Sequence, residues 1–218
     1  MSIKDIKGRD MVEATAKGVL SAIPFASSFL QAVETIKTNV IQRRYESWKQ
    51  MVDERLSALE ESQREAVFSD DCFATALMRA TQMAAETSEE KMVYLANAIQ
   101  YVAENRISED RIIIFLNCLQ KYTSSHFLIL GYFQNPAQYA DQVKHSSFMA
   151  GSIMTYFDKA YPSFDKSLQA IIIRDLFLDG FTNTDSNGTV SENGMKEKRT
   201  TVLGDEFLCF CGIGGNAI

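Results

Sequence analysis

The chain has 218 residues, of which 46% are hydrophobic, and its 22 Lys and Arg against 28 Asp and Glu give a net charge of -6. This length allows one large domain or two small ones, and the hydrophobic content fills a core without disulfide or metal cross-links. The acidic balance disfavours non-specific binding to nucleic acid or to anionic membranes. Only 3 prolines, with apolar residues at helical spacing, predict a mainly α-helical protein.

The first predicted helix spans residues 9–22 and ends before Pro24, which biases the preceding residue away from helical backbone. It overlaps an uncharged segment, residues 18–33, that is shorter and more polar than a membrane span of about 20 apolar residues. We interpret this segment as a buried helix, a corner and the start of the next helix. The alternative is a segment that inserts into a membrane or oligomerises, since Gly, Ala and Ser permit close helix packing. The candidate partner or membrane contacts are its apolar residues Val19, Leu20, Phe25 and Phe29.

Residues 25–62 contain neither Pro nor Gly and predict one long helix. Its apolar residues recur mostly at intervals of three and four, which places them on one stripe. Such a helix cannot bury its stripe alone, so later helices or another subunit must cover it. The stripe consists of Phe29, Val33, Ile36, Val40, Tyr45, Trp48, Val52, Leu56 and Leu59.

Three further helices are predicted to begin at Ser69, Ser88 and Ser108, because each serine is followed by two acidic residues. The serine hydroxyl caps the first turn, and the acids suit the positive end of the helix dipole. Short connections favour antiparallel neighbours. Residues 1–121 are therefore predicted to form a helical bundle built on the long helix.

The second half mixes helices with turn signals. Helices are predicted from Ser124 or Ser125 to the Asn-Pro pair at 135–136, over residues 145–161, and over residues 164–178, the last ending at Gly180. A polar stretch follows with two Asn-Gly turns, and its flanks, residues 181–184 and 199–202, are predicted to pair as strands. A short apolar helix closes the region.

This order of elements resembles the winged-helix family. In that family the third helix ends in a Leu-x-x-x-Gly-Phe pattern, a hairpin forms the wing, and Thr-x-Leu-Gly-x-x-Phe-Leu begins the last helix. The resemblance covers residues 122–212 and implies that residues 122–218 form a winged-helix domain with a two-stranded wing. The matching residues are Asp175, Leu176, Asp179, Gly180, Phe181, Thr201, Leu203, Gly204, Phe207 and Leu208.

A winged helix that reads DNA needs cations for phosphates and donors for base edges. From Thr123 onward the chain has seven Lys and Arg against ten Asp and Glu. We interpret the basic wing as a solvated hairpin, with contact to a phosphate backbone as the alternative. The domain is therefore predicted to mediate protein contacts or to have an auxiliary role on DNA. The candidate nucleic-acid contacts are Lys196, Lys198, Arg199 and Lys166.

The sequence does not favour an enzyme. It has two histidines, of which His126 is interpreted as a core residue and His145 as part of a loop or helix start. No Ser-His-Asp order, phosphate-binding loop or metal-ligand spacing occurs, so no catalytic residue, cofactor or metal is predicted. Cys72 and Cys118 are read as small hydrophobic residues. Free thiols and a charged N-terminus without an apolar core predict a cytoplasmic protein.

The whole chain resembles uncharacterised bacterial proteins found with antiphage defence genes, through residues 23–29, the Arg43-Arg44 pair, and residues 88–91 and 95–98. This resemblance implies an accessory or sensor subunit that works beside an effector or ATPase. We therefore hypothesise a non-catalytic interaction subunit of a bacterial complex, bound to a protein partner or to a second copy of itself. The alternatives are a DNA-binding winged-helix regulator and a membrane-active effector that uses residues 18–33.

Overall fold

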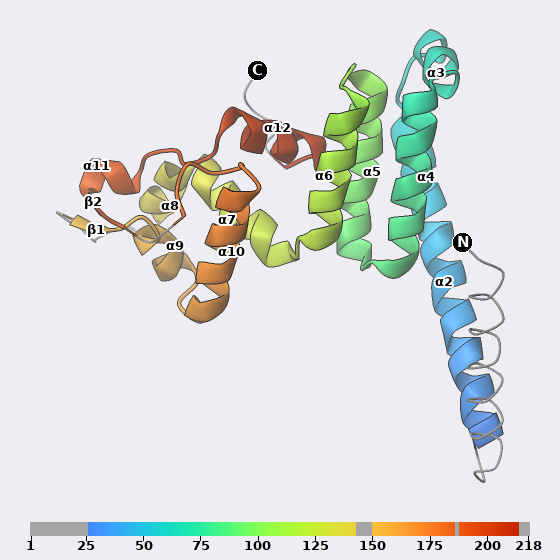
Figure 1. The fold of residues 1–218 in the computed structure, drawn as a ribbon, viewed down its shortest axis with the longest axis horizontal. Coiled ribbons are helices and arrows are strands. Elements are labelled where there is room, and N and C mark those ends of the chain that lie inside the picture. Colours follow the sequence, from blue (N-terminus) through green and yellow to red (C-terminus); the bar gives the residue numbers. More distant parts are fainter. Residues whose placement is uncertain (1–25, 143–149, 186–187, 214–218) are drawn as a thin grey trace, which may run out of the picture. The chain divides into compact units, whose positions relative to one another are not determined.

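The computed structural model describes residues 26–142, 150–185 and 188–213. This part of the chain is mainly helical and has one small antiparallel sheet (Figure 1), as the sequence predicted. The chain divides into two compact units, Met1–Ser47 and Trp48–Ile218, and the second contains the features described below. The elements are α2 (Ala26–Ser57), α3 (Glu61–Phe68), α4 (Asp71–Glu86), α5 (Glu89–Glu104), α6 (Glu109–Lys121), α7 (Ser124–Gln134), α8 (Pro136–Gln142), β1 (Ala150–Ser152), α9 (Thr155–Ala160), α10 (Lys166–Leu178), β2 (Thr189–Ser191), α11 (Glu192–Met195) and α12 (Val202–Phe210).

The long helix α2 ends at Ser57, five residues before its predicted end. A separate helix, α3, follows because Glu60 and Gln63 form a capping box, in which the Gln63 side chain accepts a hydrogen bond from the Glu60 amide at 3.3 Å. The predicted stripe is wrong at Tyr45, whose side chain is 52% exposed. It is confirmed further along the chain by four buried residues: Trp48, Val52, Leu56 and Leu59.

Helices α5 and α6 begin after Ser88 and Ser108, where the serine-acid-acid pattern predicted. The predicted cap of α4 is wrong, because Ser69 ends α3, where its hydroxyl donates to the Glu65 carbonyl at 2.9 Å, and α4 begins after Asp70. Asp70 caps α4 by accepting a hydrogen bond from the amide of Cys72 at 2.8 Å, and Ser88 caps α5 by accepting one from the amide of Lys91 at 3.4 Å. Ser108 occupies the equivalent position before α6 without a side-chain hydrogen bond. The three helices pack against one another (Figure 1).

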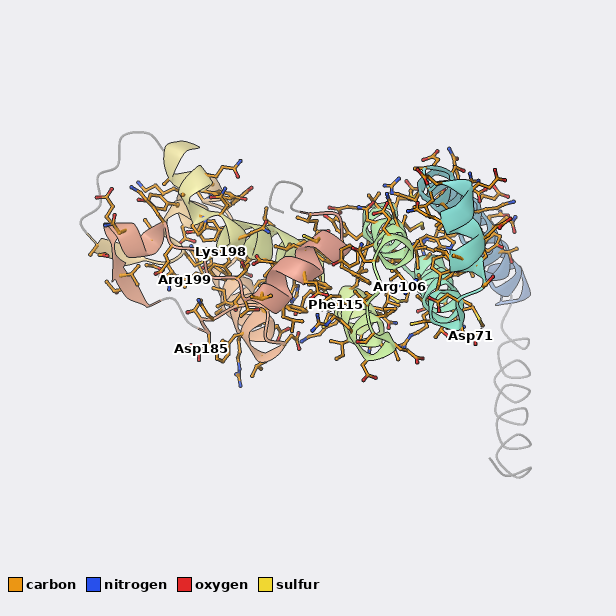
Figure 2. All side chains as sticks on the ribbon, turned by 90° about the horizontal axis from the view of Figure 1, so that it is seen from above. Asp71, Arg106, Phe115, Asp185, Lys198 and Arg199 are labelled. Carbon is orange, nitrogen blue, oxygen red and sulfur yellow. The ribbon has the colours of Figure 1, made fainter. Side chains whose placement is uncertain are left out.

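One hydrophobic core joins this bundle to the second half of the chain. The buried ring of Phe115 in α6 lies 5.4 Å from the ring of Phe207, 5.2 Å from that of Phe210 and 6.1 Å from that of Phe181. Figure 2 shows Phe115 beside α12. Residues on both sides of the predicted domain boundary at 121 and 122 therefore share aromatic contacts.

The prediction of a helix over residues 145–161 is wrong for residues 150–152, which form β1, and α9 covers only residues 155–160. β1 pairs with β2 in antiparallel register, with Gly151 opposite Val190. A Cβ atom on Gly151 would lie 2.8 Å from the Met195 sulfur and 2.6 Å from the Thr155 hydroxyl oxygen, so the missing side chain allows this close packing.

The predicted wing strands, residues 181–184 and 199–202, are not the strands of this sheet. They meet at a single antiparallel bridge between Thr182 and Thr200. The Asn183 amide donates to the Arg199 carbonyl at 2.9 Å, and the Thr201 amide donates to the Phe181 carbonyl at 3.0 Å. The two flanks thus lie together as predicted, whereas the longer pairing is made by β2 with β1.

Candidate functional site

Helix α10 carries the candidate site. Asp165 caps its first turn by accepting hydrogen bonds from the amides of Ser167 at 2.7 Å and Leu168 at 3.3 Å. Gly180 follows its last turn with a φ angle of 78°, which confirms the predicted glycine terminator. One side of the helix is buried and packs on α7. The residues on this side are Gln169, Ile172, Ile173 and Leu176.

The opposite side of α10 is exposed and largely apolar. Ile171 is 58% exposed and Leu178 is 66% exposed, and their spacing of seven residues places them on one stripe. Arg174, which is also exposed, lies between them on the same stripe. Leu168 and Phe177 are exposed at its flanks. We call Ile171, Arg174 and Leu178 the outer face of α10.

A further exposed apolar residue lies at the start of α12. Val202 is 85% exposed. The preceding residue, Thr201, donates its hydroxyl to the Gly180 carbonyl at 2.7 Å and its amide to the Phe181 carbonyl at 3.0 Å. Val202 therefore follows a residue that is held at Gly180 and Phe181, just beyond the C-terminal end of α10.

The acidic residues at this end of α10 already have partners within the chain. The Lys121 Nζ atom lies 2.9 Å from Asp179 Oδ2 and 3.7 Å from Asp175 Oδ2. The Tyr122 hydroxyl donates to Asp179 Oδ2 at 2.6 Å. Burial, together with this hydrogen bond to a carboxylate, raises the pKa of Tyr122 far above its ordinary value, so the phenol stays protonated.

His126 lies behind this cluster and is buried, as the sequence predicted. Its ring stacks on Tyr122 with centroids 4.5 Å apart, and its Nδ1 atom accepts a hydrogen bond from the Thr123 amide at 3.2 Å. Its Nε2 atom lies 3.6 Å from Asp175 Oδ2, which is too long for a hydrogen bond. Burial lowers the pKa of His126, and the nearby Asp175 carboxylate offsets this effect in part.

The predicted nucleic-acid contacts all belong to ion pairs. Lys198 pairs with Asp205 at 2.5 Å, and Arg199 pairs with Glu197 at 3.0 Å and also donates to the Gly194 carbonyl. Figure 2 shows Lys198 and Arg199 in the same region of the molecule. The remaining pairs are Lys196 with Glu192 and Lys166 with Asp158.

The predicted partner or membrane contacts are not placed by the structure. Val19, Leu20 and Phe25 lie outside the described residues, and Phe29 lies in α2, where its side chain is not described. Within the ranges that the structure describes, no helix combines the length and apolar content that crossing a membrane requires.

A hollow of about 550 Å³ lies where α3 and the start of α4 meet the C-terminal end of α5. Cys72 is the thiol in its lining. Burial and the charge of Asp70 raise the pKa of this thiol, which makes it a poor nucleophile at neutral pH because the thiolate is the reactive form. No group of three or more His, Cys, Asp or Glu side chains in the described part of the chain could hold a metal ion.

Reasoning from the sequence missed the outer face of α10. The signal for it is the run of three isoleucines at 171–173, because consecutive residues of a helix point about 100° apart and cannot all enter one core. Ile172 and Ile173 are buried and Ile171 is left outside.

Comparisons of the chain with protein-family models, curated proteins and solved structures found no match.

Proposed function

We propose that the chain is a non-catalytic protein-interaction subunit of a bacterial multi-protein complex, of the antiphage type that the sequence resembles. It binds its partner through the outer face of α10. The observation that carries this proposal is the exposure of Ile171 and Leu178 on one helix stripe, with Val202 also exposed at the start of α12. Large apolar side chains gathered on a surface are typical of sites that bind another protein.

We also propose that residues 122–218 adopt a winged-helix arrangement in which α10 is the third helix. Three observations support this arrangement. The C-terminal glycine of α10 lies where the family pattern requires it, the bridge between Thr182 and Thr200 closes a polar segment, and α12 begins at the Thr-x-Leu-Gly pattern. In DNA-binding relatives of the helix-turn-helix class, the helix in this place reads base edges in the major groove.

The DNA-binding alternative has less support. The outer face of α10 presents Ile171 and Leu178 where a reading helix presents hydrogen-bond donors. Each predicted cation of the wing must also leave a carboxylate of its own chain before it contacts a phosphate. We therefore expect that the amount of DNA duplex bound at low salt stays the same when Lys196, Lys198 and Arg199 are replaced by Ala. A loss of salt-sensitive binding in this variant would favour the regulator.

The proposal is tested by photocrosslinking in cells. A benzophenone amino acid replaces Ile171 in one variant and Met78 in a matched control, because Met78 is a similarly exposed apolar residue on α4. We expect a discrete adduct with another protein from position 171 and none from position 78. The adduct partner, identified by mass spectrometry, should co-purify with the wild-type chain and be lost with the Ile171→Asp and Leu178→Asp double variant. A monomeric chain that forms no adduct at position 171 would overturn the proposal.

A further inference from the structure

Arg174 differs from the other charged residues around the outer face. Its side chain belongs to no ion pair or hydrogen bond within the described part of the chain. By contrast, Asp175 and Asp179 are paired with Lys121, and Glu206 of α12 is paired with Arg111 at 2.6 Å. The outer face therefore consists of two apolar residues with one positive charge between them that has no partner among the described residues.

Covering this face with a partner removes water from Arg174. A guanidinium group that loses its water without gaining a carboxylate destabilises the complex strongly. A partner that supplies a carboxylate converts this cost into a charge-assisted hydrogen bond, which the guanidinium can form with both carboxylate oxygens. A partner surface must therefore be both apolar and acidic. Its apolar part covers Ile171 and Leu178, and its carboxylate pairs with Arg174.

The shape of the face favours a helix as the covering element. Ile171 and Leu178 are two turns apart on an exposed helix stripe, roughly 10 Å at 1.5 Å per residue. The ridges of such a stripe fit the grooves of a second helix whose apolar residues recur at intervals of three, four and seven.

A second copy of this chain is a poor occupant of the face. In a two-fold contact the same surface meets itself, so the partner would offer only the carboxylates of that surface. Asp175, Asp179 and Glu206 are already paired with cations of their own chain. An anionic membrane is also disfavoured, because binding to lipid headgroups draws on clusters of cations and this face presents a single one that is unpaired within the described residues.

We propose that the occupant of the outer face is an amphipathic helix of another protein. Its apolar stripe covers Ile171 and Leu178, and an acidic side chain beside that stripe pairs with Arg174. This inference rests on the proposed function, since it names the chemistry of the partner at the same surface.

The test is a selection from a displayed library of helical peptides with randomised surface positions, using the full chain as bait. We expect the enriched peptides to share an apolar stripe with Asp or Glu beside it. Their affinity should fall at least about tenfold for the Arg174→Ala chain. It should be lost for the Ile171→Asp and Leu178→Asp double variant and stay unchanged for Met78→Asp. With Arg174→Glu as bait, the selected charge should reverse to Lys or Arg.

Three results would overturn the inference. The first is a set of peptides that bind through Ile171 and Leu178 without acidic enrichment, and the second is the absence of any peptide that depends on these residues. The third is a dimer of the wild-type chain, measured by analytical ultracentrifugation, that is lost with Ile171→Asp. Either of the first two results can occur together with a cellular crosslink from position 171 to another protein. In that case the proposed function is supported, and only the inference that the partner is an acidic amphipathic helix is overturned.

Discussion

Replacement of Phe115 by Leu tests whether one core joins the bundle to the second half of the chain. Phe115 is fully buried and forms edge-to-face contacts with the rings of Phe181, Phe207 and Phe210. Each such aromatic pair contributes roughly 0.5–1.5 kcal/mol beyond apolar burial, and the contributions of neighbouring pairs are not additive. Leucine keeps most of the apolar volume but none of the ring contacts. We therefore expect the free energy of unfolding to fall by about 2 kcal/mol, and Tm by roughly 4–8 °C.

The chain contains its own reporter for this experiment. Its single tryptophan, Trp48, is buried at the start of the second compact unit, where its indole N–H donates to the Thr81 hydroxyl at 3.0 Å. Urea unfolding is followed by Trp48 fluorescence and by far-UV circular dichroism. If one cooperative unit extends from Trp48 through α12, both signals shift to the same lower midpoint in the variant.

The matched control is Ile114→Ala, because Ile114 is the neighbouring residue of α6 and its side chain is exposed. A surface substitution of this kind changes stability by no more than about 0.5 kcal/mol. The reasoning is refuted if Phe115→Leu is as stable as the control. It is also refuted if the Trp48 signal keeps the wild-type midpoint while the circular dichroism splits into two transitions, because the two halves would then unfold independently.

Two further predictions concern packing and pH. A Cβ atom on Gly204 would lie 3.0 Å from the carbonyl carbon of Phe181 and would collide with its oxygen, so Gly204→Ala should cost about 1–3 kcal/mol in thermal unfolding. Gly131→Ala, which meets no atom within 4 Å in α7, should stabilise by about 0.5–1 kcal/mol, and equal stability of the two variants would contradict this account. Because burial lowers the pKa of His126, the folded chain binds its proton less tightly than the unfolded chain, so stability should decrease as pH falls below the unfolded value of about 6.5. His126→Gln should remove this part of the pH dependence in urea midpoints, and an unchanged profile would show that other groups cause it.

The local helix signals of this sequence are strong enough to predict most helix starts. Ser88 supplies a side-chain cap within a few residues of the backbone group it satisfies, so its effect is readable without tertiary structure. The same holds for Gly180, whose left-handed φ ends α10. At α4 the cap was predicted one residue too early, because the adjacent Asp70 caps the helix in place of Ser69. The end of α2 was missed because a longer apolar pattern hid the capping box formed by Glu60 and Gln63.

The strands could not be predicted in the same way. β1 lies in a stretch with helical apolar spacing, and it becomes a strand because Gly151 pairs with Val190, 39 positions further along the chain. A partner at this separation leaves no local signal. The outer face of α10 was missed for a related reason. The apolar residues of a helix can be counted from the sequence, but which of them remain uncovered depends on what packs against the helix, here α7.

The paired charges of residues 192–205 determine how this surface responds to mutation. Asp205 accepts a hydrogen bond from the Thr200 hydroxyl at 2.6 Å and also holds Lys198. An Asp205→Asn substitution would therefore release a lysine and raise the local charge by one without adding a basic residue. The positive charge that this surface offers to a polyanion is therefore set by the acidic residue at position 205 as much as by the lysine that it holds.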